Sequence, residues 1–195
     1  MGAPATPIFL LPTGALSSKL WVLKISHFND QPLALRQITY MNALVILHSY
    51  LRWILLVLLL ASIVKSYSGW KGNKTLSAGD KKLWLFTMIT THTTLLVGLI
   101  LLLFGRFGMF TATLPEGTSV MKDAFFRFYW VEHPTMMILA VVLITIGRGQ
   151  AKKSIADAVK YKKAFWFFLI ALMIVLASIP WPFREAIARP LIPGM

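Results

Sequence analysis

The stretch from Ile46 to Val64 reads I-L-H-S-Y-L-R-W-I-L-L-V-L-L-L-A-S-I-V and is long enough to cross a bilayer as a helix. It carries His48 and Arg52 four residues apart, so a helix places the imidazole and the guanidinium on the same face. Polar groups inside a membrane segment are costly unless they are paired or functional. The stretch therefore predicts a transmembrane helix that directs two polar side chains toward its neighbours.

The composition of the whole chain is that of an integral membrane protein. Hydrophobic residues make up 57% of the 195 positions and charged residues only 14%. The net charge of +13 comes largely from lysines in short loops beside apolar runs, a distribution typical of membrane proteins, where it sets the orientation of the helices. We expect no nucleic-acid partner, because no basic-aromatic recognition motif is present. The absence of cysteine excludes thiolate zinc sites, c-type heme attachment and iron–sulfur clusters held by the chain's own thiolates.

Four apolar segments are expected to cross the membrane, at about 43–65, 83–105, 129–147 and 164–181. The predicted fold is an all-α, integral membrane four-transmembrane-helix bundle spanning 41–195. Residues 1–40 contain no uninterrupted apolar stretch of spanning length, so we expect a poorly structured extension, or a native start at Met41. The stretch from Met121 to Phe128 is expected to form a short amphipathic helix on the outer surface before the chain turns inward at Val131.

Charges in the connecting loops predict the orientation of the bundle. The loops 66–82 and 148–163 are both rich in lysine and must lie on the same side of the membrane. The positive-inside rule assigns that side to the cytoplasm, and places the middle loop and the C-terminus outside. The lipid bilayer is thus the first expected partner of the chain.

Three histidines lie in three successive spans, and their depths differ. His48 and His133 both lie near the outer ends of their helices, whereas His92 lies roughly 10 Å deeper because its helix runs in the opposite direction. The first two therefore have the matched depth that two axial ligands of one metal or porphyrin iron require, with His92 as a competing ligand. The alternative is that each histidine bonds a backbone carbonyl or a headgroup. Arg52 either extends to the interface or pairs with a heme propionate.

Motifs spread over all four segments resemble a known family. They are H-S-Y-L-R-W in the first span, T-H-T-T-L-L-V-G-L in the second, V-E-H-P-T-M-M and I-G-R in the third, and S-I-P-W-P-F at the end of the fourth. This pattern, covering about 41–183, is similar to small four-helix bacterial membrane proteins labelled cytochrome b-like. The resemblance implies heme b held by His48, His92 and His133, and it leaves open which two serve.

The leading functional hypothesis is a membrane b-type cytochrome that passes electrons from a quinol to an acceptor on the outer side, as a subunit of a larger respiratory or photosynthetic complex. The alternative is a cofactor-free structural or assembly subunit of a membrane complex. A small transporter or proton channel is less favoured, because Glu132 is the only carboxylate expected close to a membrane segment.

Overall fold

The computed structural model describes residues 32–114 and 116–191, and within these ranges the chain contains helices and no strands. In chain order they are α2 (Leu33–Lys71), α3 (Ala78–Phe104), α4 (Ala124–Arg127), the π-helix η1 (Phe128–Glu132), α5 (His133–Gly149), the 3-10 helix η2 (Gln150–Lys152) and α6 (Asp157–Ser178). The predicted all-α class is confirmed. By its contacts the chain divides into the units Met1–Tyr40 and Met41–Met195, and the packing below is that of the second unit.

Four helical stretches are long and apolar enough to cross a membrane: Leu35–Lys71, Ala78–Phe104, Ala124–Lys152 and Asp157–Ser178. They correspond one to one with the four predicted segments, so the chain is a multi-pass membrane protein built as a four-helix bundle. The first stretch starts earlier than expected, because α2 begins at Leu33 and continues through Met41 without a break. Residues 33–40, expected to be poorly structured, are therefore helical; the remainder of the expected extension, 1–31, lies outside the described residues.

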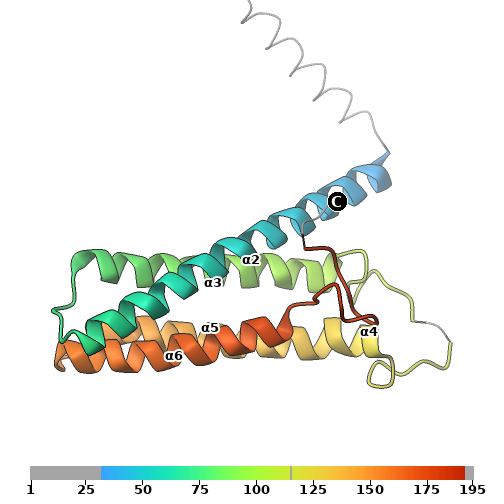
Figure 1. The fold of residues 1–195 in the computed structure, drawn as a ribbon. Coiled ribbons are helices and arrows are strands. Elements are labelled where there is room, and N and C mark those ends of the chain that lie inside the picture. Colours follow the sequence, from blue (N-terminus) through green and yellow to red (C-terminus); the bar gives the residue numbers. More distant parts are fainter. Residues whose placement is uncertain (1–31, 115, 192–195) are drawn as a thin grey trace, which may run out of the picture. The chain divides into compact units, whose positions relative to one another are not determined.

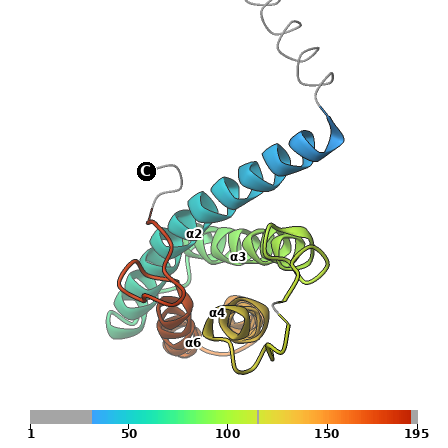
Figure 2. The same ribbon diagram turned by 90° about the vertical axis from the view of Figure 1, so that its right-hand side faces the viewer.

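The helices α3, α5 and α6 run alongside one another, while α2 crosses them obliquely (Figure 1). Viewed along the bundle, α2 closes the side left between α3 and α6 (Figure 2). We call the end that holds Lys71 and Asp157 the loop end, and the opposite end the histidine end. At the loop end α2 packs closely on α6, with the ring of Tyr67 5.6 Å from that of Phe165.

The apolar core is centred toward the loop end. Its buried members come from all four long helices and from the connection between α2 and α3; they are Leu55, Leu59, Ile63, Leu76, Trp84, Ile144, Tyr161, Ala164, Phe168 and Ala171. Two glycines allow the close approach of aromatic rings, because a methyl group on Gly69 would lie 2.6 Å from the ring of Tyr161, and one on Gly147 would lie 2.7 Å from that of Phe168.

Buried polar contacts fasten the same end. The Tyr161 hydroxyl donates to Asp80 Oδ2 at 2.6 Å, and the backbone N–H of Leu76 donates to Asp157 Oδ2 at 2.8 Å. Deeper in the bundle, the hydroxyls of Ser62 and Thr87 are 2.8 Å apart and join α2 to α3. Ser62 and Thr87 are fully buried, so their bond satisfies two hydroxyls that would be costly to bury alone, whereas the two loop-end bonds are only partly buried.

The third span begins with a π-helical turn. Instead of a separate surface helix over Met121–Phe128, α4, η1 and α5 form one continuous helical run from Ala124, so that expectation was wrong. The His133 N–H donates to the Phe128 carbonyl, five residues back. Pro134 explains the wide turn, since proline has no N–H to donate and its ring would collide with the carbonyl four residues earlier in an α-helix.

After α6 ends at Ser178, the chain turns back on itself at the histidine end. Pro180 and Pro182 stop the helix, because proline disfavours the helical conformation of the residue before it. The Arg189 N–H then donates to the Pro180 carbonyl at 3.1 Å, and the Tyr129 hydroxyl donates to the Ile187 carbonyl at 2.8 Å. The segment 179–191, which we call the tail, is thereby held beside the first residues of the third span.

Candidate cofactor site

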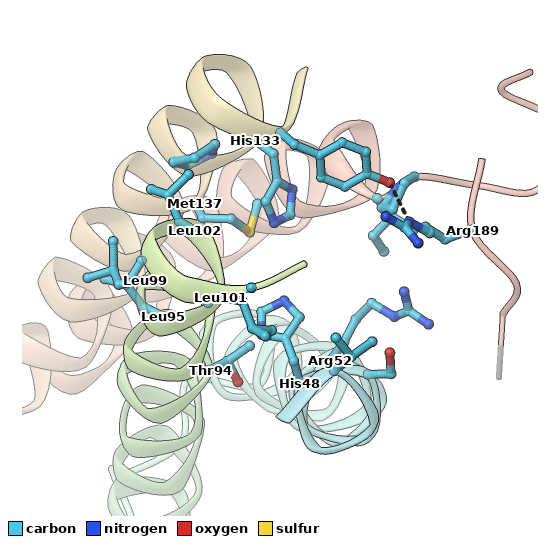
Figure 3. A pocket seen from close by; sticks show the side chains of 18 of the residues that line it. His48, Arg52, Thr94, Leu95, Leu99, Leu101, Leu102, His133, Met137 and Arg189 are labelled. Atoms are coloured by element: carbon cyan, nitrogen blue, oxygen red, sulfur yellow. Dashed lines mark hydrogen bonds between the residues drawn. The ribbon is translucent and has the colours of Figure 1, made fainter. Parts of the chain in front are cut away.

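Two of the three membrane histidines face one another at the histidine end. His48 projects from α2 and His133 from the first turn of α5, and their side chains point toward one another (Figure 3). Their ring centres are 6.4 Å apart and the ring planes are inclined by 73°. The structure therefore brings together the pair that the sequence places at matched depth.

The hydrogen bond of His133 determines which nitrogen is free. Its Nδ1 lies 2.8 Å from the Ser178 carbonyl of α6, and a carbonyl only accepts, so Nδ1 carries the proton and donates. Nε2 is then the unprotonated nitrogen with its lone pair available. Ligating histidines are usually fixed in this way, with the second ring nitrogen donating to a carbonyl or carboxylate.

His48 lies in a tighter and less polar setting. Its Nδ1 is buried and makes no hydrogen bond of ordinary geometry among the described residues, although the ring lies beside the Thr94 backbone of α3. On the α3 side Gly98 leaves room for the ring, because a methyl group there would lie 3.1 Å from His48 Cε1. A buried ring nitrogen without a partner costs free energy, so the site favours a ligand that His48 can bind.

A cavity of about 410 Å³ adjoins both rings. This is within the range of roughly 300–1,000 Å³ that small-molecule and cofactor sites occupy. Its walls come from all four long helices and the tail and are mostly apolar; they include Leu55, Leu95, Leu99, Leu102, Met137, Ala140, Val141 and Val175. α2 crosses the other helices obliquely (Figure 1), and its half that carries His48 and Arg52 lines the cavity.

His92 is not part of this site. It lies on an exposed face of α3, away from the cavity, and its Nδ1 is 2.9 Å from the Met88 carbonyl one turn earlier in the same helix. The neighbouring Thr91 and Thr94, by contrast, are buried and line the cavity. The structure therefore separates the three histidines into a facing pair and one that stands apart.

Arg52 lines the cavity one turn from His48, as expected for residues four apart on a helix. The structure shows it bonded to a backbone carbonyl: Arg52 Nη2 donates to the Leu191 carbonyl at 2.7 Å, and Trp53 Nε1 donates to the same oxygen at 3.1 Å. Arg52 Nε is buried and has no partner among the described residues. The guanidinium thus fastens the tail and keeps unused donor capacity.

Sequence reasoning missed several cavity residues. Arg106, Tyr129, Trp130 and Arg189 also line it, and they come from the loop after α3, the start of the third span and the tail. Arg189 Nε donates to the Tyr129 hydroxyl at 3.1 Å (Figure 3). Helical periodicity carries no information about such segments, and only the basic charge of Arg106 and Arg189 could have drawn attention to them.

Within residues 32–114 and 116–191 there is no cluster of three or more His, Cys, Asp or Glu side chains that could hold a metal ion. Heme iron, which takes its equatorial ligands from the porphyrin, requires at most two axial ligands from the protein. Comparisons with protein-family models, curated proteins and solved structures found no match. The facing histidine pair is consequently the feature of this site that points most directly to a function.

Proposed function

We propose that the protein is a b-type cytochrome-like electron-transfer subunit of a membrane complex, with heme b held between His48 and His133. The observation that carries the proposal is the 6.4 Å separation of the two ring centres. Metal–imidazole bonds are about 2.0–2.1 Å long, and a ring centre lies about 1.2 Å behind its nitrogen, so two rings in line on one metal have centres roughly 6.3–6.6 Å apart. The observed separation falls in that interval, and inclined ring planes are compatible with ligation from opposite sides.

Further features support the same assignment. The bond from His133 to the Ser178 carbonyl leaves Nε2 free, and His48 has a buried nitrogen without a partner. The apolar walls formed by Leu95, Leu102 and Val141 would exclude water from the ligand. When bound, heme b supplies one-electron chemistry whose potential is tuned by the axial ligands, their hydrogen bonds and burial.

The proposed partners and orientation follow from the ends of the bundle. The lysine-rich connections 66–82 and 148–163 lie together at the loop end, which we assign to the cytoplasm by the positive-inside rule. The histidine pair then lies toward the outer face of a bacterial inner membrane, with the C-terminus on that side. A quinol in the bilayer is the proposed electron donor, and another subunit of a respiratory or photosynthetic complex is the proposed acceptor.

Specific contacts also favour the cofactor-free alternative. His133 joins α5 to α6 through Ser178, and Arg52 joins α2 to the tail through Leu191. Both bonds stabilise the bundle without any cofactor, as expected of a structural or assembly subunit. The experiment below separates the two functions because only one of them requires heme uptake.

The test is the optical spectrum of the purified protein and of three single variants. The wild-type protein is expected to give the reduced-minus-oxidised spectrum of a low-spin b-type heme. His48→Ala and His133→Ala should lose it, whereas His92→Ala should keep it because His92 lies outside the cavity. Gel filtration of each variant controls for folding. Loss in His92→Ala with retention in His48→Ala would refute the ligand pair, and a wild-type protein that takes up no heme would favour the cofactor-free subunit.

A further inference from the structure

Three arginines line the cavity beside the histidine pair: Arg52 from α2, Arg106 from the loop after α3, and Arg189 from the tail. We call them the basic rim. No aspartate or glutamate is found among the described residues that line this cavity. Three guanidinium groups, which stay charged at any physiological pH, thus share one site without a counter-ion from its walls.

The three groups gather at one end of the cavity. Arg106 and Arg189 both lie over the ring of Phe107, with their Cζ atoms 5.3 and 5.4 Å from the ring centre. Arg52 and Arg189 lie on the same side of the cavity as one another, beside the space between the two histidines (Figure 3). Like charges gathered in this way repel, so an anion that joined them would be bound favourably.

Donors remain available for such an anion. A guanidinium has five N–H groups, of which Arg189 uses Nε on Tyr129 and Arg52 uses Nη2 on Leu191, while Arg52 Nε is buried without a partner. Of the nearest carboxylates, Glu132 is paired with Arg127 at 2.7 Å and Asp123 accepts from the Phe126 N–H at 3.0 Å. Since the cavity lining itself holds no aspartate or glutamate among the described residues, a ligand that brings negative charge fits it.

We propose that the basic rim binds the carboxylates of a ligand whose apolar body fills the cavity. The inference deepens the proposed function and rests on it: the ligand class is a porphyrin with two free propionates, bound with its carboxylate edge at the rim. Arginine recognises carboxylates through paired N–H donors, which gives selectivity as well as affinity. Arg106 and Arg189 join Arg52 as residues that position the ligand.

The test uses metal-free protoporphyrin, whose binding does not depend on axial ligation by the histidines. Its fluorescence is titrated with the full chain in bilayer discs of zwitterionic lipid, alongside protoporphyrin dimethyl ester, which lacks the negative charges. The wild-type protein is expected to bind the free acid at least tenfold more tightly than the ester, since hydrogen bonds to charged groups are the strong ones.

Variants at the rim should remove this preference. Arg106→Gln and Arg189→Gln are each expected to weaken binding of the free acid about three- to fivefold, the range for exposed pairs, and to leave binding of the ester unchanged. Arg189→Lys keeps a charge and serves as the second variant if Arg189→Gln loosens the tail. Arg184→Gln is the matched control, because Arg184 lies in the tail and donates to the Ala177 carbonyl outside the cavity.

Equal binding of acid and ester by the wild-type protein, or an equal effect of Arg184→Gln and Arg106→Gln, would overturn the inference. So would displacement of the free acid by anionic lipid in the discs, because the rim would then serve headgroups. His48→Ala separates this inference from the proposed function: it should abolish the heme spectrum while leaving the preference of metal-free porphyrin for the free acid intact.

Discussion

Replacing Gly69 by alanine should destabilise the loop end through the ring of Tyr161. The added methyl would lie 2.6 Å from three atoms of a ring that is 1% exposed, so the ring must move. Overpacking costs about 1–3 kcal/mol, and displacing the hydroxyl from Asp80 costs about 1.5–3 kcal/mol more. The higher helix propensity of alanine relative to glycine offsets this loss by up to about 1 kcal/mol. The expected net loss in unfolding free energy is therefore about 1.5–6 kcal/mol.

The assay is reversible unfolding in detergent, followed by circular dichroism. Gly149→Ala is the control, since nothing lies within 4 Å of a methyl group there, and its stability should be unchanged or higher by up to about 1 kcal/mol. Tyr161→Phe removes only the hydrogen bond. If Gly69→Ala acts by breaking that bond, its combination with Tyr161→Phe should cost less than the sum of the single changes. Full additivity, or no difference between Gly69→Ala and Gly149→Ala, would refute the reasoning.

Two further changes test the interior near and below the site. Gly98→Ala puts a methyl group 3.1 Å from His48 Cε1, so the ring must shift by a few tenths of an ångström. The absorption maximum and the reduction potential of bound heme should then change, while the unfolding free energy stays within about 0.5 kcal/mol of the wild-type value. Unchanged optical and redox properties would contradict the contact. Thr87→Val leaves the buried Ser62 hydroxyl without its partner and should cost about 1–2 kcal/mol in the same unfolding assay; a neutral result would mean that Ser62 finds another acceptor.

The features of the fold that could be predicted from sequence are those that lie within regular helices. The four spans and the shared face of His48 and Arg52 depend only on apolar length and on 3.6 residues per turn. The depth argument set His92 apart from the other two histidines, but the structure excludes it for a different reason. Its neighbours Thr91 and Thr94 line the cavity, so His92 is kept out by the face of α3 on which it lies. Which face of a helix meets a cavity depends on packing, and rise per residue does not give it.

What could not be predicted lies where the chain leaves that period. Arg106 and Arg189 come from irregular segments, whose paths depend on tertiary bonds such as that between Tyr129 and Ile187. The hydrogen bond from Arg52 to Leu191 required knowledge of how the tail folds back. The start of α2 before Met41 was missed because polar residues such as Arg36 and Gln37 lower the local hydropathy without disfavouring a helix.

The π-helix η1 has a consequence for how this span tolerates changes in length. A π turn is equivalent to one residue inserted into an α-helix. A chain one residue shorter between Phe128 and Glu132 could form an unbroken α-helix, but everything before the deletion would rotate by about 100° relative to His133. Tyr129 would then leave Ile187 and Arg189, and the tail would lose its attachment beside the histidine pair. The extra residue therefore sets the rotational phase between the part of the span that carries His133 and the part that holds the tail.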